Sequence, residues 1–584
     1  MARLSGSPFP TGLYRIADVR SDAPTWKWVG DATPLPPDDL TMRQTGFSSG
    51  QAFCYLEVVE GAGAADDVIF LIARAGPNQR GGLYRTQLAP AAPASTATWQ
   101  HKCWKGPTGD FWQVDAAGNL SSLDPGWVTL WKGDVLFDPV VAPSDPDRML
   151  LGFQGRLHNS ADGGHHWEQC YTTVSGGFAA TRGYDELVTQ GLDFLSDGRV
   201  VLANADLGTL VSEDARFESF QWFYPQVDRD TTSSSDVAYN REAASVIVRP
   251  DWLGGGEDGL FVLCSDITHH GAPSKLMRAK PGESDNWINV TRNLDTSDKF
   301  IPDFCFAGDR DVFAPYLQSD GPWGSGAALA GTGMLHGRCQ APDSWTWETV
   351  DAGLELGSSG YNALGLRVLF HEPSGRVFMA SALRPTPAGD GPGGIFVLDS
   401  VDDDTWTLVF GLTGDWRNFQ SLAQATDGSR LYAGTRGPQG MGDGGVLRCP
   451  DPTNAPDQWE VIANDTQSSF GQAIPFYATG WGWDLLEASR RLTDVQALAV
   501  SPSDPDVVYA SLVSNRFQPA AGLWAFNLRG LERWTYLSHG SPLESIGLQA
   551  LKFNPHEPDE LGLGTAGMQF WTLTVPGLGP RDPR

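Results

Sequence analysis

The sequence predicts an all-β fold, a single large β-propeller, and three observations carry this prediction. A short strand-like motif recurs ten times along the 584 residues. A tryptophan follows nine of the ten copies after 12 to 17 residues. Almost no segment has the 3.6-residue period of an amphipathic helix, whereas short apolar runs separated by turns are frequent. Together these features indicate repeated units of four antiparallel strands, the blades of a propeller.

The recurring motif is a glycine followed by two or three apolar or aromatic residues, often ending in a basic residue, as in GLYRT at Gly82. Such residues fit the half-buried surface of a sheet, so we expect each copy to form one strand. We expect the tryptophan that follows to pack between neighbouring blades. The copies begin at Gly12, Gly82, Gly155, Gly208, Ser274, Gly333, Gly394, Gly445, Gly522 and Gly567, and their tryptophans are Trp28, Trp99, Trp167, Trp222, Trp287, Trp347, Trp406, Trp459 and Trp534.

A second unit lies upstream of these glycines, namely two apolar runs joined by a Pro/Asp turn. Residues 140–153 (VVAPSDPDRMLLGF) and 499–512 (AVSPSDPDVVYASL) are its clearest copies. Proline presets φ and aspartate bonds to nearby backbone, so Asp-Pro-Asp is turn chemistry. Each complete unit therefore reads as strand, turn, strand, loop, strand, turn, strand.

The spacing of the motif predicts about nine blades, within a range of eight to ten, in one propeller over 1–584. The last unit has strands for three positions only, so we expect the N-terminal strands to share and complete the C-terminal blade. Residues 106–132 fit no unit and are interpreted as an insertion, with an extra hairpin as one form that it could take. Residues 464–492 are interpreted as a long loop with a candidate short helix.

Composition excludes several function classes. The formal net charge is −29, which repels phosphate backbones and anionic lipid, so we expect neither nucleic-acid binding nor membrane insertion. No apolar stretch is long enough for a membrane span and no secretory signal opens the chain. The seven scattered cysteines form no CxxC pair and read as buried free thiols, which favours a cytoplasmic location. A mature secreted protein remains the alternative.

One turn carries a sharper signature, in the residues Ser160, Asp162, Gly163, Gly164 and Trp167. This S-x-D-G-G-x-x-W pattern resembles the Asp box of sialidase-type (BNR-repeat) propellers. Relatives in that superfamily include xyloglucanase-type hydrolases and sortilin-type receptors, the latter similar in blade number. The resemblance implies a propeller fold, in which the box is a structural turn and not a catalytic site. Sialidase activity is disfavoured, because the Arg-Ile-Pro segment of those enzymes is represented here by Arg15-Ile16-Ala17.

Two aspartates are the candidate catalytic residues. Asp206 and Asp266 occupy equivalent positions of adjacent units, in loops between the second and third strands. The stretch ANADLGTL around Asp206 resembles the segment that holds a catalytic Asp in xyloglucanase-type hydrolases. Two carboxylates across a cleft can protonate a glycosidic oxygen and activate water. The alternative is that each Asp ends a strand and bonds its own loop.

Our first functional hypothesis is a non-catalytic scaffold that binds a protein or carbohydrate partner, and the second is a glycoside hydrolase that uses the two aspartates. Exposed aromatic residues could stack on sugars or anchor a peptide. The candidates are Trp323, Phe476, Tyr477, Trp481 and Trp483, with packing within their own loop as the alternative. We expect no cofactor and no metal, since Asp266, His269 and His270 lack a well-spaced further ligand.

Overall fold

The computed structural model describes the strands of the chain and most of the short turns between them. The described residues are 14–16, 26–28, 52–59, 67–74, 81–88, 100–105, 111–114, 120–122, 139–142, 145–153, 156–170, 172–175, 178–181, 188–205, 208–222, 243–265, 274–280, 287–294, 296, 299–319, 329–342, 344–354, 367–381, 384–386, 389–391, 394–411, 418–436, 445–464, 495–512, 522–529, 534–538, 541, 543, 547–565 and 570–575.

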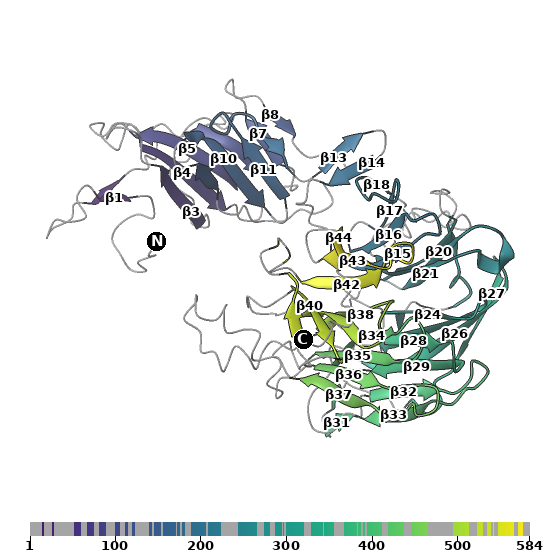
Figure 1. Cartoon of the computed structure of the whole chain (residues 1–584). Helices are drawn as coiled ribbons and strands as arrows, with labels where there is room; N and C mark the ends of the chain where they lie inside the picture. Colours follow the sequence, from purple (N-terminus) through teal and green to yellow (C-terminus); the bar gives the residue numbers. More distant parts are fainter. Residues whose placement is uncertain are drawn as a thin grey trace. The chain divides into compact units, whose positions relative to one another are not determined.

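The chain divides into two compact units, each built from antiparallel sheets (Figure 1). Unit 1 comprises residues 1–173 and 181–186, and unit 2 comprises residues 174–180 and 187–584. Unit 1 contains a hairpin, a six-stranded sheet and a four-stranded sheet. Their strands are β1 (Tyr14–Ile16) and β2 (Trp26–Trp28); β3 (Ala52–Val59), β4 (Asp67–Arg74), β5 (Gly81–Leu88), β6 (Gln100–Lys105), β7 (Phe111–Val114) and β8 (Leu120–Ser122); and β9 (Val140–Ala142), β10 (Asp145–Phe153), β11 (Arg156–Ser160) and β12 (Glu168–Gln169).

Unit 2 contains seven successive sheets, which we number 1 to 7. Sheet 1 is formed by β15 (Thr189–Phe194), β16 (Val200–Asn204), β17 (Gly208–Ser212) and β18 (Phe220–Trp222), extended by β13 (Thr172–Ser175) and β14 (Phe178–Thr181); sheet 2 by β19 (Ala243–Arg249), β20 (Gly259–Cys264), β21 (Lys275–Ala279) and β22 (Ile288–Asn289); and sheet 3 by β23 (Lys299–Phe300), β24 (Cys305–Ala307), β25 (Asp311–Ser319), β26 (Leu329–Ala341) and β27 (Ser344–Thr349).

The remaining sheets follow the same plan. Sheet 4 is formed by β28 (Arg367–His371), β29 (Arg376–Ser381), β32 (Gly394–Leu398) and β33 (Thr407–Gly411), with the hairpin β30 (Arg384–Thr386) and β31 (Gly389–Gly391) between β29 and β32; sheet 5 by β34 (Asn418–Gln424), β35 (Leu431–Arg436), β36 (Gly445–Cys449) and β37 (Glu460–Asn464); sheet 6 by β38 (Val495–Val500), β39 (Val507–Leu512), β40 (Gly522–Asn527) and β41 (Trp534–Tyr536); and sheet 7 by β42 (Leu548–Phe553), β43 (Glu560–Thr565) and β44 (Phe570–Thr574).

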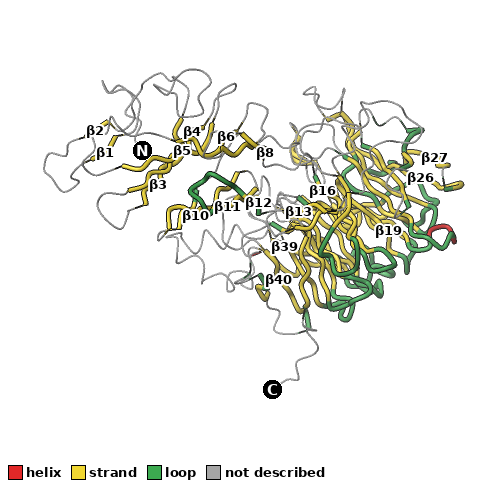
Figure 2. The backbone as a smooth tube through the Cα atoms, turned by 90° about the horizontal axis from the view of Figure 1, so that it is seen from above, coloured by secondary structure: helices red, strands yellow, loops and turns green. Residues whose placement is uncertain are grey.

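Helix is almost absent from the described residues. Figure 2 shows one short helical turn, the 3₁₀ turn η3 (Trp252–Gly254), among strands and loops. Within the same residues, no helix reaches the length and hydropathy of a membrane span.

Each sheet of unit 2 buries apolar side chains against the next, and the series closes into a ring. Separate hydrophobic clusters join sheets 1 and 2, 2 and 3, 3 and 4, 4 and 5, 5 and 6, and 6 and 7. A further cluster joins sheet 7 back to sheet 1, because Leu192 and Phe194 of β15 pack with Ala550 of β42 and Phe570 of β44. In Figure 1 the yellow strands β42 and β43 accordingly lie beside the teal β15.

The all-β propeller prediction is confirmed, but its arrangement differs from the one we expected. The first three motif copies fall in unit 1, and the ring of unit 2 closes with the seven sheets that follow. The expected closure through the N-terminal strands is wrong for the described strands, since β1 pairs with β2 and β44 pairs with β43. The motif identifies the strands of each local unit, but it does not indicate which units belong to the same ring. Residues 106–132 contain β7 and β8, which extend a sheet of unit 1 as a hairpin.

The recurring tryptophans of unit 2 whose side chains are described pack between sheets, as predicted. Trp287 is fully buried in the cluster of sheets 1 and 2, and Trp459 lies in that of sheets 4 and 5. Trp406 of sheet 4 is 2% exposed, and its Nε1–H donates to the carbonyl of Val350 at 2.7 Å, at the end of sheet 3. The indole donors of Trp406 and Trp459 are satisfied in these buried positions, since the Trp459 Nε1–H donates to the Pro456 carbonyl at 2.9 Å.

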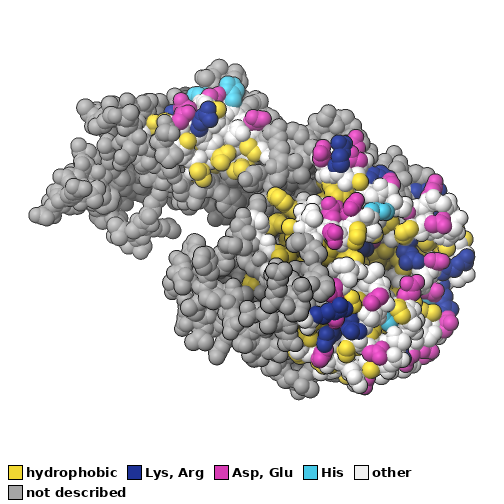
Figure 3. All heavy atoms as spheres, viewed as in Figure 1, with side chains coloured by type: hydrophobic (Ala, Val, Ile, Leu, Met, Phe, Trp, Pro, Cys, Tyr) yellow, Lys and Arg dark blue, Asp and Glu magenta, His cyan; other side chains and the backbone are white. Residues whose placement is uncertain are grey.

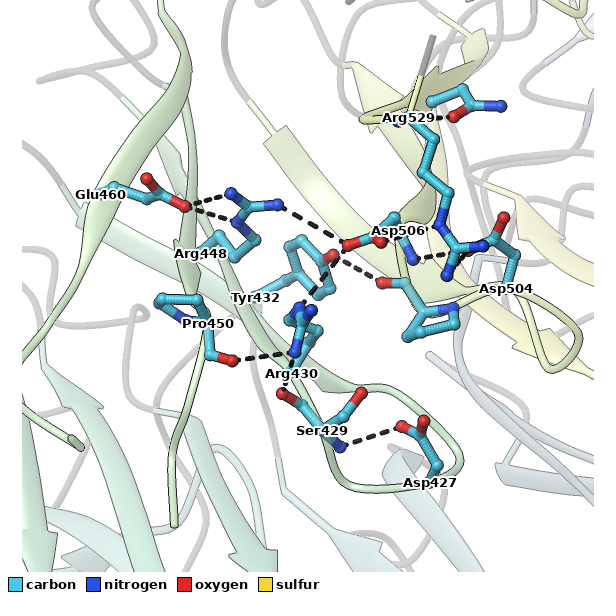
Figure 4. A network of polar contacts seen from close by, with 12 residues as sticks. Asp427, Ser429, Arg430, Tyr432, Arg448, Pro450, Glu460, Asp504, Asp506 and Arg529 are labelled. Atoms are coloured by element: carbon cyan, nitrogen blue, oxygen red, sulfur yellow. Dashed lines mark hydrogen bonds and ion pairs between the residues drawn. The ribbon is translucent and has the colours of Figure 1, made fainter. Parts of the chain in front are cut away.

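Polar side chains join the sheets at the turns between first and second strands, as Figure 4 shows for sheets 5 and 6. Asp506 lies near three guanidinium groups, at 3.0 Å from Arg529 Nε, 3.5 Å from Arg430 Nε and 3.6 Å from Arg448 Nη1. The hydroxyl of Tyr432 donates to the Pro505 carbonyl at 2.6 Å. The basic residue at the end of the motif therefore has a physical role, because Arg448 reaches the turn of the next sheet.

We predict that Asp506→Asn destabilises the ring, because it leaves three arginines facing a neutral amide. Asp506 is only 13% exposed, so the expected loss is about 2 kcal/mol. Urea unfolding followed by circular dichroism would measure it as a lower midpoint. The control is Asp427→Asn, an exposed residue that accepts one bond from the Ser429 N–H, and its effect should stay within about 0.5 kcal/mol. Equal midpoints for the two variants would contradict the prediction.

Candidate functional site

One face of the unit 2 ring carries the connections between second and third strands, and we call it the connection face. It is defined by the strand-end pairs Asn204 with Gly208, Cys264 with Lys275, Ser381 with Gly394, Thr435 with Gly445, and Leu512 with Gly522. The first strands begin at the same face, since Thr189 pairs with Asn204 and Val495 with Leu512. The turns between first and second strands lie at the opposite ends.

The sequence-predicted site residues of unit 2 all fall outside the described residues. Asp206 belongs to the β16–β17 connection, Asp266, His269 and His270 to the β20–β21 connection, and Trp323 to the β25–β26 connection. Phe476, Tyr477, Trp481 and Trp483 follow β37, and so does the rest of the predicted loop 464–492 beyond Asn464. No cluster of three metal-ligating side chains occurs in the described part of the chain.

The strands that flank the two aspartates nevertheless occupy matching positions. Asn204 and Cys264 each end a second strand, opposite a first strand that carries a one-residue bulge at the same register. β15 and β19 contact each other as the first strands of adjacent sheets. Both connections therefore leave the connection face at neighbouring, equivalent points.

A layer of buried polar side chains lies directly beneath these connections. Thr189 Oγ1 donates to Asn204 Oδ1 at 2.8 Å, and the hydroxyls of Ser265 and Ser274 are 2.7 Å apart. The hydroxyl of Ser274 also accepts the backbone N–H of Ile301, 2.8 Å away in sheet 3. The bond to Ile301 thus joins sheet 2 to sheet 3 at this level.

Three polar atoms of this layer have no hydrogen-bond partner, namely Asn204 Nδ2, Thr209 Oγ1 and Ser381 Oγ. All three residues are at most 1% exposed. An unpaired buried polar group costs about 1–3 kcal/mol, so such groups mark positions where a water or ligand is expected to bind. Sequence reasoning missed them because a polar residue that ends a strand looks like a solvated one. The only signal was a polar residue after an apolar run, as in VVLAN and RVFMAS.

Two carboxylates, Asp193 of β15 and Asp303 between β23 and β24, also join sheets, and both were missed from the sequence. Asp193 Oδ2 accepts the Val248 N–H at 2.9 Å, and its Oδ1 lies 2.7 Å from Lys552 Nζ across the ring closure. Asp303 Oδ2 accepts the Val368 N–H at 3.1 Å. Burial raises the pKa of Asp303, although the positive charge of Arg367 and the Val368 N–H oppose the shift. These bonds give both carboxylates a structural role.

A thiol nucleophile is disfavoured at this face. Cys264 ends β20 and is 2% exposed, and burial raises the pKa of its thiol to about 12. A thiolate is required for nucleophilic attack, so this cysteine stays protonated and inert near neutral pH. The described cysteines, Cys170, Cys264, Cys305, Cys339 and Cys449, are all free.

The turn from Ser160 to Trp167 joins β11 to β12 in unit 1. Ser160 Oγ accepts the Gly164 N–H at 2.9 Å, and Asp162 Oδ1 accepts the His165 and His166 N–H groups at 3.1 and 2.9 Å. Gly163 and Gly164 have φ of +71° and +86°, the left-handed region that favours glycine. Trp167 is 5% exposed, and its Nε1–H donates to the Gly164 carbonyl at 3.0 Å. These contacts are those of a structural turn.

The carboxyl of Asp162 is acidic because the turn donates hydrogen bonds to it. Partial burial by itself raises the pKa, but the backbone N–H of His166, its ring and the Ser160 hydroxyl outweigh that effect and lower it to about 2. A depressed folded pKa stabilises the folded state above the unfolded pKa of about 4. That contribution is lost as the pH falls toward 2.

Comparisons with known proteins support the fold. No protein-family profile and no curated protein matches the sequence. An ancestral GH74 enzyme is structurally similar, with a TM-score of 0.54 and 14% identity over 91% of this chain and 66% of that chain, just under two thirds of its length. YCF48 from Cyanidioschyzon merolae aligns with a TM-score of 0.40 and 13% identity over 67% of this chain and 96% of that chain. An oligogalacturonate lyase in complex with manganese aligns with a TM-score of 0.40 and 9% identity over 70% of this chain and 95% of that chain.

The fold is a β-propeller. The likeness to the GH74 enzyme, at 14% identity, supports the architecture and carries no residue role to this chain. The connection face of this propeller is therefore assessed from its own side chains.

We predict that removing an unpartnered hydroxyl stabilises the protein, whereas removing a bonded one destabilises it. Ser381→Ala should raise the free energy of unfolding by about 1 kcal/mol, because it deletes a buried unsatisfied group. Ser511→Ala should lower it by a similar amount, because Ser511 Oγ donates to the Leu548 carbonyl at 2.6 Å. Chemical denaturation of both variants is the measurement. Shifts of the same sign would show that Ser381 is already satisfied.

We also predict that Asp162→Ala loosens the turn of unit 1. The peptide spanning 160–168 should exchange its amide hydrogens about tenfold faster in hydrogen–deuterium exchange at pH 7, because two N–H groups lose a carboxylate acceptor. His165→Ala keeps both backbone bonds and serves as the control. Unchanged exchange in Asp162→Ala would mean that the Ser160 and Trp167 contacts alone hold the turn.

Proposed function

We propose that the protein is a non-catalytic binding propeller that holds a protein or carbohydrate partner on its connection face. The unpartnered buried groups Asn204 Nδ2, Thr209 Oγ1 and Ser381 Oγ carry this proposal. A rigid ring of packed sheets keeps them in place, and the connections around them supply the variable surface. Such groups lower stability in the free protein, which is the usual consequence of a site selected for binding.

The second candidate is a glycoside hydrolase that uses Asp206 and Asp266. The matching positions of their connections on adjacent sheets favour this hypothesis, because catalysis requires two carboxylates near one glycosidic bond. The propeller likeness to a GH74 enzyme is compatible with it. The unpartnered buried side chains next to these connections carry hydroxyls and amides, which suit binding.

Binding and hydrolysis make opposite predictions for one set of proteins. Wild type, Asp206→Asn and Asp266→Asn would be assayed on a panel of β-glucan polysaccharides for retention in affinity electrophoresis and for release of reducing ends. A binding propeller releases none with any of the three proteins, and the neutral variants change retention by less than about threefold. Release by wild type that falls at least about a hundredfold in both variants would establish the hydrolase and overturn the first proposal.

A further inference from the structure

The first strands of sheets 1, 2, 5, 6 and 7 carry a one-residue bulge at the same register, close to the connection face. In β15 the bulged residue is Gln190, in β38 it is Gln496 and in β42 it is Gln549. The bulge of β34 places Gln420 at the same position. In sheet 2 that position is Ala244. A bulge leaves its extra residue out of the ladder and re-aims its side chain, and such bulges are frequent beside functional sites.

The four bulges with glutamine lie on consecutive sheets, because sheets 5, 6, 7 and 1 are neighbours in the ring. Close contacts hold three of these bulges, those of β38, β42 and β15, against the preceding sheet. A Cβ on Gly434 would approach Val495 Cγ1 to 2.6 Å, and one on Gly564 would approach the Thr189 carbonyl oxygen to 2.9 Å. Ser511 Oγ donates to the Leu548 carbonyl at 2.6 Å. Val495, Leu548 and Thr189 are the residues just before the three glutamines.

The side chains of Gln190, Gln496 and Gln549 are available for a ligand. Each is partly exposed, whereas the residue before it is fully buried. Within the described residues, these amides have no hydrogen-bond partner. We call Gln190, Gln496 and Gln549 the glutamine arc. Beside its Gln190 end lies an unpartnered buried atom, Asn204 Nδ2, on the residue that pairs with Thr189.

The surroundings of the arc favour an uncharged ligand. Asp193 and Lys552 lie three residues along the strands from Gln190 and Gln549, and they neutralise each other at 2.7 Å. Acidic and basic side chains are also interspersed over the visible face of unit 2 (Figure 3). The net charge of −29 repels an anionic ligand. Amides and hydroxyls, which both donate and accept, match the hydroxyl groups of a neutral sugar chain.

An extended peptide fits this arc less well than a saccharide. A peptide added as a strand needs a regular row of free backbone N–H and C=O groups. The bulges interrupt that row on each strand of the arc. Recognition here therefore falls to side-chain amides.

We infer that the glutamine arc is the binding site for an uncharged oligosaccharide. The site lies close to the connection face, on the first strands, which contact one another around the centre of the ring. The inference rests on the proposed binding function and gives it a ligand class and named residues. Gln496 and Gln549 supply contacts from sheets 6 and 7, and Gln190 extends them to sheet 1.

The test uses the full chain in isothermal titration calorimetry with cellohexaose, mannohexaose, maltohexaose, laminarihexaose and xylohexaose. A hyaluronan hexasaccharide is the charged comparison, and an array of neutral hexapeptides is the alternative ligand class. At least one neutral hexasaccharide should bind more tightly than the charged one. Gln496→Ala and Gln549→Ala should each weaken it about tenfold, since each loses an amide contact.

Gln458→Ala is the matched control, because Gln458 is an exposed glutamine between β36 and β37, at the face opposite the arc. It should change affinity by less than about twofold, and all variants should melt within about 2 °C of wild type. Saccharide binding that the double variant Gln496→Ala/Gln549→Ala retains would overturn the arc but leave the proposed function intact. Binding of no neutral hexasaccharide, or of peptides alone, would overturn the saccharide assignment.

Discussion

The packing of sheet 7 against sheet 1 is the contact on which the rest of unit 2 depends. An open row of sheets leaves an apolar face bare at each end, and neither face is stable in water. Leu192 and Phe194 cover one of these faces with Ala550 and Phe570 from the other end of the chain. Lys552 and His556 add polar contacts across the same boundary, to Asp193 and to the Leu195 carbonyl. Closure brings the five first-strand bulges and the ends of the strands to one face.

Local features of the chain predicted the strands well. Gly208, Gly394, Gly445 and Gly522 each begin the third strand of a sheet, as the motif indicated. The number of sheets in the ring depends on a contact between residues that lie more than 350 positions apart. A motif of five residues cannot indicate such a long-range contact. GLYRT in unit 1 and GVLRC in unit 2 therefore look alike although they belong to different units.

The candidate site was harder to predict than the fold. Asp206 and Asp266 stand out in the sequence because carboxylates are familiar catalytic groups, and the structure places their connections at equivalent points. Asn204 and Ser381 do not stand out, because their importance comes from being buried without a partner, which only the packing reveals. The glutamines appear in the sequence as T-Q-G-L, V-Q-A-L and L-Q-A-L. Their candidate role depends on the bulge in each strand. A bulge can be recognised only from the register with the neighbouring strand, which the sequence does not show.

The boundary between sheets 7 and 1 also determines how the ring responds to mechanical load. The described strands on its two sides belong to different sheets, so no backbone ladder crosses it. Tension applied at Thr189 and Val575 would slide side chains past one another and would not have to unzip a series of backbone hydrogen bonds. The ring should therefore open first at this boundary, with the packing at the other six boundaries still intact.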